Sequence, residues 1–183
     1  MPDYSNIKGR VKNAKEGKGD FVPLIPDGEE SATHTLRFVS ASIEKSKGGN
    51  IQAVFKCQVK KRGSELNNKD ENIYYLLEHP NAPWQLDHFL AVMDGLGLDW
   101  SRIPEDMEHS GWNDIFYDLG EVSEKIDFEV EYKYQYFNSG PNKGQKKKGY
   151  DKRVNFDDIK KVKWPAVESD SKDDEGDDED DTP

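Results

Sequence analysis

Hydrophobic and polar residues alternate along two stretches of this chain, and each stretch predicts a half-buried β-strand. In residues 51–61, "IQAVFKCQVKK", the apolar positions share one face, with Val54 as the exception. The other face carries Gln52, Lys56, Gln58 and Lys60. Residues 125–137, "KIDFEVEYKYQYF", repeat the pattern. Because successive side chains of a strand point to opposite faces, each stretch offers one face to a core and one to water.

Three further stretches, 33–45, 73–78 and 152–164, predict strands by their β-branched and aromatic content. Between 78 and 125 the spacing of apolar residues changes to that of a helix, in "NAPWQLDHFLAVMDGLGLDW". Pro83 suits the first turn of this helix, and Gly95 and Gly97 end it. A short second helix is expected within residues 111–122.

This order of elements predicts a mainly β fold with three strands, a helical insert and two more strands. A five-stranded Greek-key OB-fold barrel has this order, with a helix between strands 3 and 4. Such a barrel binds oligonucleotides on strands 2 and 3 and on the loops between strands 1 and 2 and strands 4 and 5. We expect the folded domain to span residues 21–167.

The charge of the chain is concentrated at its C-terminus. The formal net charge is −11, and the final stretch "ESDSKDDEGDDEDDTP" carries −9 of it, so residues 1–167 carry only −2. A run of like charges without apolar residues cannot bury enough surface to offset its ordering entropy, so residues 168–183 are expected to form a disordered acidic tail. Residues 1–20 lack the apolar segment of a secretory signal and are expected to form a flexible, mildly basic arm.

Lysine and glycine occur together in two predicted loops, "EKSKGGN" and "NSGPNKGQKKKGY", which fall between strands 1 and 2 and between strands 4 and 5. A basic groove beside aromatic rings is the physical arrangement that holds a single strand of nucleic acid without reading its sequence. The polar face of residues 51–61 adds further lysines. The predicted nucleic-acid site comprises Lys45, Lys47, Lys56, Lys60, Lys61, Arg62, Tyr74, Lys133, Phe137, Lys143, Lys146, Lys147, Lys148 and Tyr150.

Strand parity distinguishes rings for stacking from rings for the core. It turns Tyr74 outward and Tyr75 inward, while Phe137 and Tyr150 border the second lysine loop. Unless a bulge intervenes, parity places three tyrosines on the core face: Tyr132, Tyr134 and Tyr136. A solvated turn for the lysines and a core role for the tyrosines remain open as simpler explanations.

The sequence offers little for catalysis, metal binding or a membrane. The four histidines fall on different predicted elements, and no zinc-protease, nucleophile-elbow, phosphate-loop or dinucleotide motif is present. The single cysteine, Cys57, excludes an internal disulfide, suits a reducing cytoplasm and is expected in the core. No apolar run reaches the roughly 18 residues of a membrane span. We therefore expect no enzyme activity, no cofactor, no metal site and no membrane partner.

Over roughly residues 21–164 the chain resembles a family of phage single-stranded DNA-binding proteins with an OB-fold. The resemblance rests on "DFVPLIPDGEE", on "WQLDHFLAVMDGLGLD", and on "YDLGEVSEKIDFEVEYKYQYFNSGPNKGQKKKGYDKRVNFDDIKKV". The acidic C-terminus is also similar to those of bacterial and phage single-strand binders. Tails of that kind often end in an aromatic or apolar tip, whereas this chain ends in Asp181, Thr182 and Pro183.

The resemblance and the charge pattern together lead to one expected function. The protein is expected to coat exposed single-stranded DNA, without sequence preference, in phage DNA replication or recombination in the cytoplasm of an infected host cell. The tail is expected to modulate binding and to contact phage or host replication proteins. Two alternatives stay open: an RNA-binding OB-fold protein, and an acidic-tail chaperone or DNA mimic that binds basic proteins.

Overall fold

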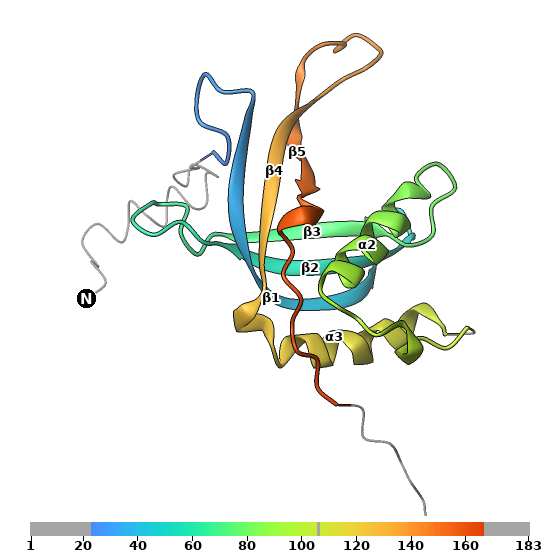
Figure 1. Cartoon of the computed structure of the whole chain (residues 1–183). Helices are drawn as coiled ribbons and strands as arrows, with labels where there is room; N and C mark the ends of the chain where they lie inside the picture. Colours follow the sequence, from blue (N-terminus) through green and yellow to red (C-terminus); the bar gives the residue numbers. More distant parts are fainter. Residues whose placement is uncertain (1–22, 106, 167–183) are drawn as a thin grey trace, which may run out of the picture.

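The computed structural model of the chain describes residues 23–105 and 107–166, all of them within the predicted domain. Five strands form one antiparallel sheet in the order β3-β2-β1-β4-β5 (Figure 1). The prediction of a mainly β fold is confirmed. The predicted arm, 1–20, and acidic tail, 168–183, lie outside the described residues. The strands are β1 (Ser31–Lys45), β2 (Ile51–Val59), β3 (Asp70–Leu76), β4 (Asp127–Tyr136) and β5 (Lys146–Val154).

Two α-helices lie between β3 and β4, in the interval where the sequence predicts them. They are α2 (Trp84–Gly95), which starts directly after Pro83, and α3 (Trp112–Gly120). Each helix turns one apolar face toward the sheet, and the buried residues of α2 are Phe89, Val92 and Met93. Four short 3-10 helices complete the described chain: η1 (Trp100–Arg102), η2 (His109–Gly111), η3 (Ser123–Lys125) and η4 (Phe156–Asp158).

The long strand β1 bends and pairs on both sides. Its first half, from Ser31 to Arg37, is paired with β4, while its second half, from Leu36 to Lys45, is paired with β2. A bulge at Val39 lies within the half paired with β2, just past the end of the pairing with β4, since the register with β2 shifts between Phe38 and Ser40. Bulges increase local twist and bend a strand. As a result β4 and β5 rise away from the layer formed by β2 and β3 (Figure 1).

The sheet is not closed into the predicted barrel, because β3 and β5 are its two outer strands and are not paired with each other. Pairing of β4 with β1 ends at Lys133, so beyond that point β4 is paired only with β5. The outer half of the β4–β5 hairpin, residues 134–150, therefore projects from the body of the molecule as a two-stranded ribbon (Figure 1). We call it the hairpin tip.

The prediction that residues 152–164 form the last strand is wrong. Strand β5 begins at Lys146, because Tyr136 pairs with Lys146 across a turn that uses Gly140 and Gly144 at positive φ. The lysines assigned to a loop are thus the first residues of a strand. Strand β5 ends at Val154, and the Asn155 side chain then accepts a hydrogen bond from the backbone N–H of Asp157 to start η4.

An aromatic cluster fills the space between the sheet and the two helices. Phe55 lies at its centre, fully buried, with ring contacts to five neighbours on both layers: Phe38, Tyr75, Phe89, Phe116 and Phe128. Cys57 is buried on the same face of β2, as predicted. Four of these pairs are edge-to-face and the pair with Phe128 is stacked. Both arrangements add to the free energy gained by burying the ring surface, so this cluster holds helices and sheet together.

Residues 159–166, which we call the C-terminal segment, lie against the end of α2. The Leu96 carbonyl accepts hydrogen bonds from the backbone N–H of Val162, at 3.1 Å, and from Nε1 of Trp164, at 3.0 Å. A Cβ atom at Gly95 would lie 3.1 Å from the side chain of Ile159, so glycine permits this close approach. The segment thereby fixes α2 relative to η4 and β5.

Truncation of the central ring should separate core packing from surface effects. We expect Phe55→Ala to lower the free energy of unfolding by about 3–5 kcal/mol, because it removes a fully buried ring and leaves a cavity. Urea denaturation followed by circular dichroism measures this change. As a matched aromatic control, Tyr117→Ala on the exposed face of α3 should change the value by less than about 0.5 kcal/mol. Equal effects of the two variants would contradict the assignment of Phe55 to the core.

Candidate nucleic-acid interface

The hairpin tip carries four exposed lysines close together. Lys143 lies in its turn, and the other three, Lys146, Lys147 and Lys148, begin β5. The ammonium group of Lys146 lies 3.6 Å from the ring centre of Tyr134, and that of Lys147 lies 5.5 Å from the ring centre of Phe137. None of the four forms an ion pair within the described residues, so their charges are available to a polyanion. The hairpin tip therefore combines cations and rings, as the sequence predicts.

A bulge changes which rings of the hairpin tip face water. Tyr132 is fully buried, as parity predicts, and Tyr134 is half-buried. The register of β4 with β5 shifts between Tyr134 and Tyr136, and Tyr136 is 37% exposed with its hydroxyl donating to Glu30 at 2.8 Å. Strand parity thus fails at Tyr136, because the bulge turns it outward. Phe137 is exposed, as predicted.

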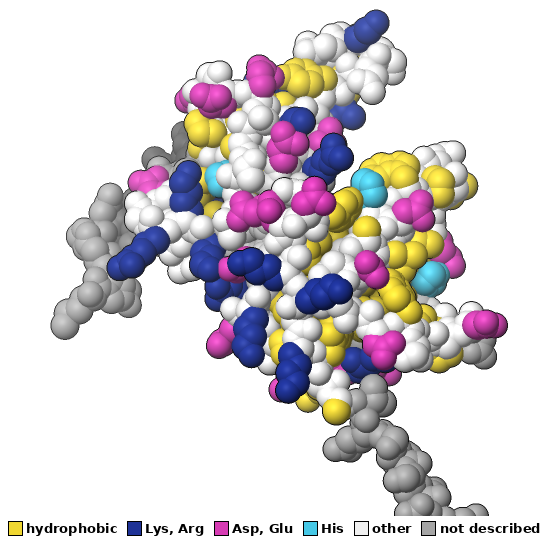
Figure 2. All heavy atoms as spheres, viewed as in Figure 1, with side chains coloured by type: hydrophobic (Ala, Val, Ile, Leu, Met, Phe, Trp, Pro, Cys, Tyr) yellow, Lys and Arg dark blue, Asp and Glu magenta, His cyan; other side chains and the backbone are white. Residues whose placement is uncertain are grey.

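A groove of about 540 Å³ lies between β3, the start of α2 and the β4–β5 hairpin. Two predicted stacking residues line it from opposite walls: Tyr74 on β3, which is 51% exposed, and Tyr150 on β5, which is half-buried. The parity prediction that Tyr74 faces outward and Tyr75 inward is confirmed. We call this hollow the aromatic groove. Figure 2 shows hydrophobic side chains over α2 and in the hollow between α2 and the hairpin.

Trp84 also lines the aromatic groove, and the sequence prediction missed it. In the sequence it is only one of the apolar residues at helical spacing, and in the structure it is 53% exposed. Its ring contacts His88, whose own ring contacts Phe156 of η4. The sequence did offer a signal for this exposure: Trp84 directly follows Pro83 and so lies in the first turn of the helix. A residue in the first turn lies at the end of the helix, away from the centre that packs on the sheet.

The aromatic groove contains rings and amides but little free positive charge. Its one lysine, Lys152, donates hydrogen bonds to Glu71 Oε2 at 2.6 Å and to the Asn72 carbonyl at 2.7 Å. On the β4–β5 wall, Gln135 donates to Asp151 at 2.6 Å. The groove therefore suits flat, uncharged rings, whereas the hairpin tip beside it suits phosphates.

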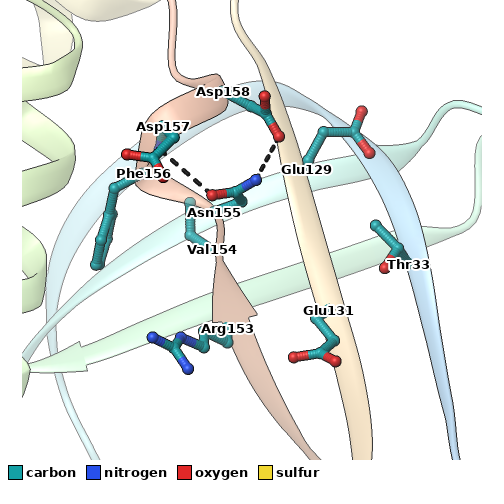
Figure 3. Close-up of a pocket in the computed structure, with 9 residues that line it drawn as sticks. All are labelled: Thr33, Glu129, Glu131, Arg153, Val154, Asn155, Phe156, Asp157 and Asp158. Carbon is teal, nitrogen blue, oxygen red and sulfur yellow. Dashed lines mark hydrogen bonds between the residues drawn. The ribbon is translucent and has the colours of Figure 1, made fainter.

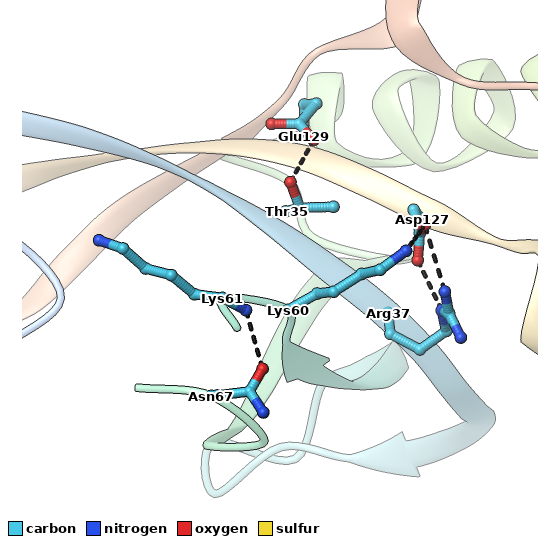
Figure 4. A network of polar contacts seen from close by, with 7 residues as sticks. All are labelled: Thr35, Arg37, Lys60, Lys61, Asn67, Asp127 and Glu129. Carbon is cyan, nitrogen blue, oxygen red and sulfur yellow. Dashed lines mark hydrogen bonds and ion pairs between the residues drawn. The ribbon is translucent and has the colours of Figure 1, made fainter. Parts of the chain in front are cut away.

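Three other predicted lysines are already paired with carboxylates. Lys60 lies 2.7 Å from Asp127, which also binds Arg37 at 2.6 Å, and Figure 4 shows both cations converging on this carboxylate. Lys56 lies 3.7 Å from Glu44, and Lys133 lies 3.0 Å from Glu131. Pairing reduces the net attraction that these lysines offer to a polyanion.

The remaining predicted cations lie apart from the hairpin tip. Lys47 is exposed in the turn between β1 and β2, and Lys61 and Arg62 are exposed after β2, with the Lys61 side chain extending away from the Asp127 network in Figure 4. Lys45 lines a different pocket, of about 730 Å³, together with four glutamates: Glu44, Glu78, Glu105 and Glu108. The structure thus joins the predicted rings and the β5 lysines, but it does not join the two predicted loops into one clasp.

An acidic pocket of about 400 Å³ opens on the outer side of β4 and β5. Figure 3 shows its lining, in which Arg153 is the only basic side chain among four carboxylates: Glu129, Glu131, Asp157 and Asp158. This excess of negative charge opposes a phosphate. Within residues 23–105 and 107–166, no group of three or more His, Cys, Asp or Glu side chains is arranged to hold a metal ion.

A second group of lysines, absent from the sequence prediction, lies on the C-terminal segment. Lys160, Lys161 and Lys163 are exposed there. Figure 2 shows basic side chains both on the hairpin and in a band over the start of β4 and the C-terminal segment, with acidic side chains between the two. The acidic pocket therefore separates two basic areas on this face.

Comparison with known proteins does not identify a family or a function for this chain. No protein-family model matches this chain, and no curated protein matches it. Among the helices of the described residues, none has the length and apolar character needed to cross a bilayer.

The network at Asp127 generates a prediction about acid stability. Partial burial raises the pKa of Asp127, but hydrogen bonds from Arg37 and Lys60 outweigh it, so the pKa lies below its ordinary value. Such a group stabilises the fold above its ordinary pKa, near 4, and this stabilisation is lost as the pH falls through the lower folded-state pKa. We expect Asp127→Asn to be less stable than the wild type at pH 7, with the difference shrinking as the pH falls below about 4. Urea denaturation across this range measures it.

The exposed Glu65, in the loop after β2, provides the matched control. Glu65→Gln should leave the unfolding free energy unchanged at both ends of the pH range, since its side chain forms no ion pair in the described part of the chain. A difference between wild type and Asp127→Asn that stays constant down to pH 2 would contradict a role for the ionised carboxylate.

Proposed function

We propose that this protein binds single-stranded DNA without sequence preference, with bases in the aromatic groove and phosphates on the hairpin tip. The observation that carries the proposal is the placement of Tyr74, Trp84 and Tyr150 around one groove, directly beside the lysines that begin β5. Aromatic faces accept any base, and a basic surface follows the backbone, so this combination suits a strand of any sequence.

We also propose that the fold is a partly open OB-fold. An OB-fold is a five-stranded Greek-key barrel, and it is often incompletely closed. The order β3-β2-β1-β4-β5, in which β4 returns beside β1 after a long connection, is the Greek-key order. The helices between β3 and β4 and the bulged, two-sided β1 fit the same architecture. In a closed barrel the outer strands are joined by backbone hydrogen bonds. Here Lys152 of β5 forms hydrogen bonds to Glu71 and Asn72 of β3 instead.

The biological setting in this proposal comes from the resemblance to phage single-stranded DNA-binding proteins. In that setting the protein protects exposed strands during phage replication or recombination, in the cytoplasm of an infected cell, and acts as a binding protein rather than an enzyme. The acidic tail then modulates binding and contacts replication or recombination proteins. A tethered polyanion of charge −9 competes for the same lysines as DNA, because its effective concentration near them is on the order of millimolar.

Titration of the full chain with fluorescent oligo-dT, at low and at high salt, tests the proposal. We expect binding at low salt that weakens as salt rises, since phosphate contacts release counterions. Oligo-U of the same length is the matched comparison: tighter binding of the RNA would favour the RNA-binding alternative. No binding of either oligomer at low salt would overturn the proposal and favour a role for the acidic tail toward basic proteins.

The hairpin tip should carry most of the salt dependence. Four phosphate contacts give a slope of log affinity against log salt of about −3 for a single strand. Changing Lys146, Lys147 and Lys148 together to glutamine should reduce the slope to about −1, because three of these contacts are lost. Fluorescence anisotropy at four salt concentrations measures the slope.

The matched control changes three exposed lysines of the C-terminal segment, Lys160, Lys161 and Lys163, to glutamine. It alters the net charge equally but leaves the hairpin tip intact, so its slope should stay near that of the wild type. Equal slopes for the two triple variants would mean that only total charge matters and that the hairpin tip holds no phosphate.

The rings of the aromatic groove should contribute through stacking. We expect Tyr74→Ala, Trp84→Ala and Tyr150→Ala each to weaken oligo-dT binding by about 1–3 kcal/mol where a base stacks. Thermal unfolding should change little for Tyr74 and Trp84, which are half exposed. Phe137→Ala tests the ring at the hairpin tip in the same way.

Trp100 supplies the control, because it is 40% exposed on η1 and does not line the aromatic groove. Trp100→Ala should leave the affinity for oligo-dT unchanged. Binding of DNA should quench the tryptophan fluorescence of the wild type, and it should quench that of Trp84→Phe to a smaller extent. Quenching that persists fully in Trp84→Phe would place the bases elsewhere.

A further inference from the structure

The two outer strands of the sheet face each other across a seam that no backbone ladder closes. Strands β3 and β5 end the order β3-β2-β1-β4-β5 on either side. Lys152 of β5 crosses the seam, and its ammonium group donates to Glu71 Oε2 at 2.6 Å and to the backbone carbonyl of Asn72 at 2.7 Å. One side chain therefore binds both a side chain and the backbone of the opposite edge. Among the described residues, no other side-chain hydrogen bond joins β3 to β5.

This bridge is largely shielded from water. The Lys152 side chain is 21% exposed and that of Glu71 only 11%, and the Lys152 ammonium group lies 5.7 Å from the ring centre of Tyr132. Screening by water and salt is weaker for such a pair than for an exposed one. Beneath it lies the hydroxyl of Tyr132, buried without a hydrogen-bond partner, and Cys57 pairs with Glu71 in the register of β2 with β3.

The bridge connects the two walls that carry the rings. On β5, Lys152 is two residues from Tyr150, so the two side chains share a face of the strand. On β3, Asn72 is two residues from Tyr74, and its amide donates to the Tyr74 hydroxyl at 3.0 Å. The spacing between Tyr74 and Tyr150 across the aromatic groove thus depends on the bonds that Lys152 makes to the opposite edge.

We propose that Lys152 is a positioning residue that holds the β3–β5 seam closed and sets the width of the aromatic groove without contacting phosphate. The expected effect on DNA binding rests on the proposed function. The contact between β3 and β5 is a property of the protein alone and can be tested without DNA. Loss of the bridge lets β5 move relative to β3, which separates the rings and gives water access to the buried residues beneath.

The single cysteine reports on the seam in the absence of DNA. Cys57 is 2% exposed, and burial raises the pKa of its thiol to about 12, so it should react slowly with a disulfide reagent such as dithiobis(nitrobenzoate). We expect Lys152→Met to raise the labelling rate by about tenfold or more, because local opening exposes the thiol. Lys152→Arg, which keeps a donor to the opposite edge, should restore most of the protection.

Two further variants keep the labelling test decisive. Lys160→Met removes an exposed lysine of the C-terminal segment and should label at the wild-type rate. If Lys152→Met does not fold, as thermal unfolding would reveal, Glu71→Gln weakens the same bridge from β3 and should raise the rate by a smaller factor. A wild-type labelling rate in a folded Lys152→Met or Glu71→Gln protein would overturn the proposal.

Oligo-dT titration then separates positioning from phosphate contact. We expect Lys152→Met to bind about tenfold more weakly, with the slope of log affinity against log salt unchanged, because no phosphate contact is lost. A slope reduced by about 0.7 would identify Lys152 as a phosphate ligand and overturn the proposal. If no variant binds DNA, the proposed function fails, while the labelling rates still decide whether Lys152 closes the seam.

Discussion

The two-sided pairing of β1 is the constraint on which the rest of this structure depends. Its first half is hydrogen-bonded to β4 and its second half to β2, and a bulge at Val39 lies just past the end of the pairing with β4. A strand shared in this way bends the sheet, so β2 and β3 form one layer while the β4–β5 hairpin rises from it. The hairpin tip projects because β1 ends its pairing with β4 at Lys133, and the aromatic groove lies where β3 and β5 are not paired through their backbones.

Ion pairing then decides which lysines of the folded domain can attract phosphates. Carboxylates lie within 4 Å of Lys56, Lys60 and Lys133, so these lysines contribute little to a field that attracts phosphates. The lysines of the hairpin tip have rings rather than carboxylates as neighbours, and a ring leaves the charge of an ammonium group intact. A nearly neutral domain thereby keeps available positive charge next to the rings of the groove, and acidic residues separate this area from the second group of exposed lysines on the C-terminal segment.

Core and groove share the same strands, which links stability to binding geometry. The inner face of β2 and β3 packs Phe55 and Tyr75 into the aromatic cluster, while Tyr74, which directly precedes Tyr75 on β3, points outward to the groove. Helix α2 has the same double role, with Phe89 in the core and Trp84 in the groove. A ring supported by a strand or helix with a packed opposite face loses little conformational entropy when a base stacks on it.

The sequence alone determined the elements that depend on near neighbours. Alternation identified β2 and β4, helical spacing and Pro83 identified α2, and parity assigned Tyr74 outward and Cys57 inward, because these features repeat within a few residues. Only the tertiary structure decided the start of β5, the outward turn of Tyr136 and the exposure of Trp84. It also decided which lysines are neutralised, since Lys60 and Arg37 meet a carboxylate 67 and 90 residues away in the chain. Contacts over such separations are set by how the sheet bends, and no local pattern encodes that bend.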